Sequence, residues 1–406
     1  MSAFKILAAI FMVIGSLSSL GAAAPNEYII VLKAGISARS VDAHVGEVHG
    51  MHANSLGRRE LNLPGVEDIY SIGTFQGYCG TFDNDTISKI QAMPEVSSVW
   101  LDEGAEELAW VKQDNAEHGL ASLSSRGPGQ TAFSYEDTAA KGLFAYVVDS
   151  GIQADHPDFG GRVTRGFSIN GNYDNIRPHG TMVAGVLASK TYGVAKNAQI
   201  IDVRANEIGN SKAAWVLSGI NWAAKDIIDK GRTRQAVINV SLSAKASVAK
   251  VADMFAPPDK SPVNLAVEAA FKLGVLTVAA AGNSQTSDPV TVTPGSARNA
   301  LTVGAIDRDW KFSGNFSNHG SMVDILAPGT NVVTISSAQT GPVRVDGTSF
   351  ASPYVAGVAL SLSALEKFGS VQELVDRIKA LGTAGKVTGL PPNTVNLVAF
   401  NGAPSA

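Results

Sequence analysis

The chain has 406 residues, of which 45% are hydrophobic and 17% are charged, and its formal net charge is −4 at pH 7. This length allows a large hydrophobic core together with an accessory module. The composition excludes an intrinsically disordered chain. The charge is mild and no lysine- or arginine-rich run occurs, so no nucleic-acid partner is expected.

Residues 1–23 have the pattern of a secretory signal peptide. Lys5 precedes an apolar run over residues 6–14, and small residues follow at positions 21–24. The alternative is a membrane anchor, but interior serines and glycines shorten the apolar stretch and disfavour a membrane span. We therefore expect cleavage near Ala23, secretion to the extracellular space and no membrane contact afterwards. The single cysteine, Cys79, fits this setting because a large secreted domain can be stable without disulfides.

Residues 24–110 are predicted to form a small α+β domain, with its ordered part near residues 27–102. Apolar β-rich runs and helical patterns follow each other in the order β-α-β-β-α-β, which is typical of a ferredoxin-like split βαβ unit. The two helices are expected at residues 38–48 and between an Asn84-Asp85 cap and Pro94. Residues 103–125 have the character of an exposed polar linker, where proteolysis concentrates.

Residues 111–406 are predicted to form a doubly wound α/β domain with a mostly parallel sheet. Uninterrupted apolar runs occur at residues 143–148, 237–240 and 275–281, and such runs are typical of parallel strands that are buried on both faces. Helical patterns at residues 215–228 and 263–273 lie between them. The alternation of strands and helices predicts helices on both faces of the sheet.

Polar residues follow these strands, at the edge of the sheet where open α/β folds place their functional groups. Asp149 follows the first strand and Asn283 the third, while His179 and Ser349 stand near two predicted helix starts. Acyl transfer needs a nucleophile, a base, a group that orients the base, and hydrogen-bond donors for the oxyanion. Ser349, His179, Asp149 and Asn283 could fill these roles in that order. Each residue alone has an ordinary alternative as a helix cap, a turn residue or a surface side chain.

The chain order Asp149, His179, Ser349 is that of subtilisin and differs from the orders of chymotrypsin and of the α/β-hydrolases. The surrounding motifs VVDSGI, HGTMVAG and GTSFASPYVAG resemble the three active-site motifs of subtilases. Segments at residues 192–196 and 316–329 resemble the proteinase K-like branch of that family, and the resemblance covers most of residues 112–401.

The resemblance implies a secreted serine endopeptidase that acts on proteins or peptides through an Asp-His-Ser triad and an acyl-enzyme, without an organic cofactor. It implies that Asn283 and the Ser349 amide bind the oxyanion. Residues 28–101 resemble the inhibitory propeptide of such enzymes, which implies a zymogen that is inhibited by its own propeptide and cleaves itself between residues 107 and 111. We expect the mature enzyme to be a monomer.

The substrate-binding strand departs from the family pattern. The resemblance implies that substrate pairs with Ser241, Leu242, Ser243 and Ala244 as an added strand. Ser243 and Ala244 stand where the family has two glycines, which predicts either a narrower primary specificity pocket or a shifted substrate strand. Arg177-Pro178 replaces the usual glycine before the histidine, and proline favours an extended backbone at Arg177.

A calcium site is a further expectation from the resemblance. Asp324 matches the carboxylate ligand of a family site whose other ligands are main-chain carbonyls, here those of Arg298 and Ala300. A buried, hydrogen-bonded aspartate without a metal is an equally good explanation.

Three sequons, at Asn84, Asn239 and Asn315, match the N-glycosylation pattern. Asn239 lies in a predicted core strand and Asn84 in the propeptide, which leaves Asn315 as the candidate for the mature protein.

Two other functions deserve comparison with a peptidase. A catalytically silent subtilase fold used for binding is conceivable from the altered strand, although such a protein is expected to have lost a triad residue. A serine esterase of the α/β-hydrolase type conflicts with the chain order and lacks a Gly-x-Ser-x-Gly elbow around Ser349.

Overall fold

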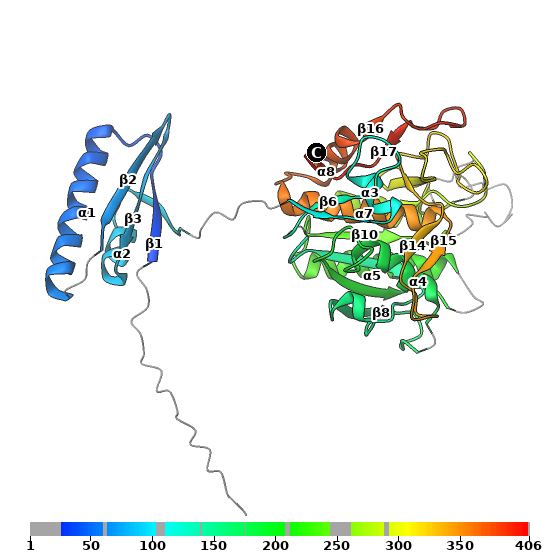
Figure 1. The fold of residues 1–406 in the computed structure, drawn as a ribbon. Helices are drawn as coiled ribbons and strands as arrows, with labels where there is room; N and C mark the ends of the chain where they lie inside the picture. The colour runs from blue at the N-terminus through cyan, green and yellow to red at the C-terminus, as the bar shows by residue number, and fades with distance from the viewer. Residues whose placement is uncertain are drawn as a thin grey trace, which may run out of the picture. The chain divides into compact units, whose positions relative to one another are not determined.

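The computed structural model describes residues 26–59, 63–102, 110–138, 140–174, 176–207, 212–243, 261–287 and 292–404. The chain divides into two compact units, Met1–Glu107 and Leu108–Ala406 (Figure 1). The signal peptide expected at residues 1–23 and Ala244 of the predicted substrate strand lie outside the described residues, as does most of the expected maturation site.

The first unit has the predicted order β-α-β-β-α-β. Its described strands form a sheet in the order β2-β3-β1-β4, with β1 antiparallel to both β3 and β4. Side chains from both helices join alternate residues of β1 in one core, so the helices cover the same face of the sheet. The elements are β1 (Asn26–Leu32), α1 (Ala38–Arg59), β2 (Gly65–Ile72), β3 (Phe75–Phe82), α2 (Asn84–Gln91) and β4 (Val96–Leu101).

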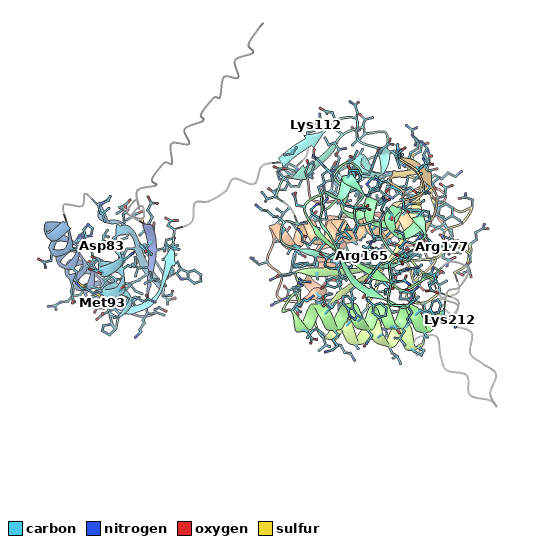
Figure 2. All side chains as sticks on the ribbon, turned by 90° about the horizontal axis from the view of Figure 1, so that it is seen from below. Asp83, Met93, Lys112, Arg165, Arg177 and Lys212 are labelled. Atoms are coloured by element: carbon cyan, nitrogen blue, oxygen red, sulfur yellow. The ribbon has the colours of Figure 1, made fainter. Side chains whose placement is uncertain are left out.

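Both helices of this unit differ from the prediction at their ends. Helix α1 continues to Arg59 and does not stop at Val48, because His52 is buried and packs edge-on against the Phe82 ring of the sheet. Helix α2 is capped by Asp83, one residue before the predicted cap, at the position labelled in Figure 2. The Asp83 carboxylate accepts hydrogen bonds from two main-chain N–H groups in the first turn of α2.

The second unit is built on a mostly parallel sheet. Nine of its described strands are ordered β16-β17-β13-β12-β11-β10-β7-β9-β8, and the pairs from β17 to β8 are parallel. These strands are β7 (Phe144–Asp149), β8 (Val163–Ser168), β9 (Gln199–Arg204), β10 (Ala236–Val240), β11 (Leu276–Ala280), β12 (Leu301–Ile306), β13 (Ile325–Pro328), β16 (Thr383–Ala384) and β17 (Leu397–Val398).

Helices cover both faces of this sheet, as the alternation of patterns predicted. Helices α3, α4, α7 and α8 share one core with the sheet, whereas α5 and α6 share the other. Their bounds are α3 (His118–Leu123), α4 (Pro178–Ala188), α5 (Ala213–Asp229), α6 (Pro262–Lys272), α7 (Thr348–Leu365) and α8 (Val371–Leu381). The described unit also contains two small two-stranded antiparallel sheets and a 3-10 helix, η1 (Pro157–Phe159). One sheet pairs β5 (Trp110–Gln113) with β6 (Phe133–Glu136), and the other pairs β14 (Val332–Thr334) with β15 (Val343–Val345).

Helix α7 crosses the middle of the second unit (Figure 1). Within the described residues it is the one helix that is long and apolar enough to cross a membrane, but 78% of it is buried inside the protein. Its apolar character is therefore that of a central core helix, whose first turn is held at one edge of the sheet.

Candidate active site

The carboxyl ends of three neighbouring strands bring the predicted residues to one edge of the sheet. Strands β11, β10 and β7 are adjacent and parallel, so Asn283, Ser241 and Asp149 emerge side by side. Helices α4 and α7 begin at the same edge, because Gly180 N–H donates to Ser150 Oγ (3.0 Å) and Thr348 N–H donates to Asn283 Oδ1 (2.9 Å). Ser241 and Ser349, which are 108 positions apart in the sequence, thus come within hydrogen-bond distance.

Asp149 and His179 form a direct pair. The Asp149 side chain is fully buried, and its Oδ1 accepts the Ser150 N–H (2.7 Å) and lies 2.8 Å from His179 Nδ1. Because an ionised carboxylate only accepts hydrogen bonds, the proton of the neutral imidazole belongs on Nδ1, which leaves Nε2 as a free base. Helix α4 closely approaches the chain segment that follows Asp149. A Cβ at Gly180 would lie 2.4 Å from the Gly151 carbonyl oxygen, so only glycine fits at position 180.

Burial and charge act on the His179 imidazole in opposite directions. Burial lowers its pKa, but the charge of Asp149 and the hydrogen bond to it raise the pKa by more, while the Arg177 cation lowers it slightly. The net result is a pKa above the ordinary value of 6.5. Arg177 has the extended backbone predicted for a residue before proline, with φ −81° and ψ 148°.

Ser349 lies in the first turn of α7. Its Oγ donates to the Ser241 carbonyl oxygen (3.1 Å), and the Phe350 ring that follows it has its centroid 5.5 Å from that of the His179 ring. The residue next to the nucleophile candidate therefore contacts the base candidate at this edge, although the Ser349 hydroxyl is directed to Ser241 and not to His179. The positive end of the α7 dipole also lies at this point.

The Asn283 amide is oriented by Thr348. Its Oδ1 accepts from both Thr348 N–H and Thr348 Oγ1, each at 2.9 Å. Because a main-chain N–H can only donate, the amide oxygen must face Thr348 and the amide nitrogen must face away. Asn283 is exposed, and a Cβ at Gly347 would lie 3.3 Å from its Nδ2. Gly347 has φ 141°, a conformation suited to glycine.

Ser241 is fixed beneath the first turns of α7. Its hydroxyl donates to the Ser349 carbonyl oxygen (2.8 Å), lies 3.0 Å from Ser352 Oγ, and accepts from Asn239 Nδ2 (2.9 Å). Leu242 is half-buried and Ser243 is exposed at the end of the described strand. This network, and the parts that Thr348 and Ser352 play in it, were missed from the sequence because a serine or threonine near a helix start is common.

The predicted calcium ligand is engaged by protein groups. Asp324 Oδ2 accepts the Thr302 N–H (2.9 Å), and Asp324 Oδ1 binds the Lys379 ammonium (2.7 Å). Calcium is bound by six to eight oxygen ligands, whereas here an ammonium group occupies the carboxylate that would be the central ligand. Within the described residues there is also no group of three or more His, Cys, Asp or Glu side chains that could hold a metal. The residues present, with Arg298 exposed and Ala300 buried before β12, therefore do not fit a calcium ion.

The sequons lie in different environments. Asn239 is fully buried in β10 and hydrogen-bonded to Ser241, so its amide is not accessible for glycan attachment in the folded protein. Asn84 is the first residue of α2, and Asn315 is exposed.

Comparison with known proteins identifies the class to which this site belongs. Residues 140–389 match the family described as "Subtilase family", and residues 27–106 match "Peptidase inhibitor I9". The chain is 42% identical over 389 residues to "Subtilisin-like proteinase Mp1" of Magnaporthiopsis poae, with 93% of this chain and 92% of that protein covered. It is 38% identical over 385 residues to "Alkaline protease 1" of Emericella nidulans, with the same coverage of 93% and 92%. A solved "cold adapted subtilisin-like serine proteinase" matches with a TM-score of 0.63 and 29% identity, over 72% of this chain and 100% of that one.

The chain therefore belongs to the subtilase family. It is a serine endopeptidase with a subtilisin-like α/β fold, and it carries an N-terminal I9 inhibitor domain of the kind found in zymogens. The predicted family, fold class and enzyme class are confirmed.

Proposed function

We propose that Asp149, His179 and Ser349 are the catalytic triad of this endopeptidase, and that the enzyme is secreted. The observation that carries the proposal is the 2.8 Å bond between buried Asp149 and His179, set beside the α7 turn that bears Ser349. The bond fixes the tautomer that a general base needs, and Asp149 stabilises the imidazolium that forms when the base takes a proton.

In the proposed reaction, the Ser349 hydroxyl exchanges its bond to Ser241 for one to His179 Nε2 when substrate binds. His179 then takes the hydroxyl proton as Ser349 Oγ attacks the peptide carbonyl carbon. The proton passes to the leaving amine, which departs and leaves an acyl-enzyme. Water, deprotonated by the same base, hydrolyses the acyl-enzyme and restores the Ser349 hydroxyl.

Two donors are assigned to the oxyanion of the tetrahedral intermediate. One is Asn283 Nδ2, which is turned away from Thr348 by the bonds to Oδ1. The other is the Ser349 N–H, which belongs to the first turn of α7 and so has no partner within the helix. Its neighbours are already engaged, since Thr348 N–H binds Asn283 and Phe350 N–H binds the Gly347 carbonyl. Losing one such donor typically costs ~10²–10³ in rate.

The substrate is proposed to pair with residues 241–244 as an added strand, and the enzyme to be selective for the residue before the cut. Ser243 is exposed and carries a side chain where the family pattern has glycine. We expect poor cleavage after large apolar residues in a peptide library. Ser243→Gly should broaden the cleavage pattern, and broad cleavage by the unaltered enzyme would contradict this part of the proposal.

Expression of the full chain beside Ser349→Ala tests the triad and the zymogen together. The unaltered chain should lose its I9 domain by cleavage between residues 107 and 111, mature as a secreted monomer, and be labelled by a fluorophosphonate. Ser349→Ala should remain full-length and unlabelled. An unaltered chain that is neither processed nor labelled would argue for a silent subtilase fold used for binding.

A further inference from the structure

A row of charged residues lies on the sheet beside Asp149; Asp202 and Arg204 are buried, and Arg165 at its outer end is exposed. Strand β9 pairs with β7 in the registers Val147↔Asp202 and Asp149↔Arg204, and β8 pairs with β9 in the register Arg165↔Asp202. Residues in register, and residues two apart along a strand, point to the same face of a sheet. Arg165, Asp202, Arg204 and Asp149 therefore share the face that α4 covers, at the edge where the active site lies.

Asp202 and Arg165 bind the two main-chain polar groups of one residue, Ile152. Asp202 Oδ2 accepts the Ile152 N–H (3.1 Å), Arg165 Nη1 donates to the Ile152 carbonyl oxygen (2.6 Å), and the two charged groups also bond to each other. Ile152 ends the tight turn that starts at Asp149 and passes through Gly151 at φ 93°. The charged pair thus fixes the far end of the turn whose near end carries the catalytic carboxylate. Arg165 is labelled in Figure 2.

The environment of Asp202 is costly for a charge. Asp202 is fully buried in the apolar run Ile200-Ile201-Asp202-Val203, and its Oδ1 has no hydrogen-bond partner in the described structure. Burial raises its pKa to about 6, the Ile152 N–H and Arg165 act against that rise, and the Asp149 charge adds to it. A carboxylate in such a position lowers the stability of the fold relative to an apolar residue of similar size. Its presence here therefore favours a role that an apolar residue could not fill.

The other charged groups nearby have partners of their own. Arg204 donates to the main chain of Asn172 and Asp174 and to the Asn172 side chain. The Tyr173 ring lies over the Arg165 guanidinium at 4.5 Å. In α4, His179 is bonded to Asp149, and Arg177, just before that helix, is exposed.

We propose that Asp202, with Arg165 as its counter-ion, is a positioning residue of the triad: it clamps the Asp149 turn, and its negative charge helps Asp149 to stabilise the His179 imidazolium. This inference rests on the proposed function, since it assigns Asp202 a part in that reaction. Asp202 does not touch substrate, and it acts through Asp149 and the turn.

Asp202→Asn removes the negative charge of Asp202 but keeps its hydrogen bond to the turn, because the amide oxygen can still accept the Ile152 N–H. Loss of the negative charge should lower the pKa of His179 by roughly 0.5 unit, which corresponds to about a threefold change in its protonation equilibrium. The acid limb of the kcat/KM profile should move to lower pH by the same amount, and kcat on the plateau should fall roughly three- to tenfold. A merely structural role would lower the melting temperature without moving the profile.

Asp226→Asn is the matched control. Asp226 Oδ2 accepts from Tyr146 Oη (2.7 Å), so this carboxylate packs against the same strand β7, but Tyr146 points to the opposite face of the sheet. Asp226→Asn should lose stability and leave the acid limb in place.

A readout that needs no turnover keeps the inference separate from the proposed mechanism. His179 is titrated by NMR of its imidazole Cε1–Hε1 group in the full chain carrying Ser349→Ala, with and without Asp202→Asn. A lower His179 pKa in the Asp202→Asn chain supports the inference, and an unchanged pKa overturns it. Activity and fluorophosphonate labelling of the Ser349 chain decide the proposed function independently of that titration.

Discussion

Asn283 combines a structural and a proposed catalytic role in one amide, and substitutions can separate the two. Its oxygen accepts two hydrogen bonds from Thr348 at 2.9 Å and so caps α7, while its nitrogen is the proposed oxyanion donor. Asn283→Asp keeps an acceptor of the same shape, and a carboxylate at a helix N-terminus is favourable. It removes the donor and places negative charge where the oxyanion develops.

The expected magnitudes follow from counting these bonds. Asn283→Asp should lower kcat by at least ~10²–10³, equivalent to about 2.7–4 kcal/mol, with little change in the free energy of unfolding. Asn283→Ala should lower kcat by a similar factor and also cost about 1–2 kcal/mol of stability, because both bonds to Thr348 are lost. The difference in unfolding free energy between the two variants gives the contribution of the bonds from Thr348 to Asn283 Oδ1. The loss of kcat that both variants share gives the contribution of the Asn283 Nδ2 donor.

The assay is hydrolysis of a chromogenic peptide by enzyme whose active sites have been counted with a fluorophosphonate, together with thermal unfolding. Thr348→Ala is the control, because it removes one of the two bonds to Asn283 but leaves Nδ2 in place. It should cost stability and reduce kcat less than roughly tenfold. An Asn283→Asp enzyme with kcat within tenfold of the unaltered enzyme would refute the assignment of the donor.

Three further predictions concern pH, packing and calcium. The kcat/KM profile should fall as pH decreases through a value above 6.5, because the base must be neutral and the pKa of His179 is raised. Arg177→Gln should move this acid limb to higher pH, because the Arg177 cation lowers the His179 pKa. A shift to lower pH would contradict that effect of Arg177. Gly180→Ala should abolish most activity and lower the melting temperature, since its Cβ would lie 2.4 Å from a main-chain oxygen, whereas Gly127→Ala, which has open space around it, should change neither. The melting temperature should be the same in calcium and in EGTA. Lys379→Met should lower the free energy of unfolding by less than about 1 kcal/mol, because the Lys379–Asp324 ion pair is partly exposed. A large rise in the melting temperature of the unaltered protein in calcium would show that an ion displaces the lysine.

The sequence by itself determined the fold class and the identity of the candidate triad. Short uninterrupted apolar runs are typical of strands buried on both faces, so residues 143–148, 237–240 and 275–281 predicted the centre of the parallel sheet. Local chemistry also fixed the extended backbone at Arg177, because the following proline restricts it. These features depend on neighbours in the chain, and the sequence shows all of those neighbours.

Only the tertiary structure decided which distant groups share a partner. The sequence contains Asp324 as a candidate calcium ligand, but it does not show that Lys379, 55 positions later, reaches that carboxylate. Asp202 is visible as a charge within an apolar strand, yet its bond to Ile152 depends on the register between β7 and β9. The physical reason is that a charged side chain is satisfied by whichever group the fold brings within hydrogen-bond distance, and that choice is made by the packing of strands and helices far apart in the chain.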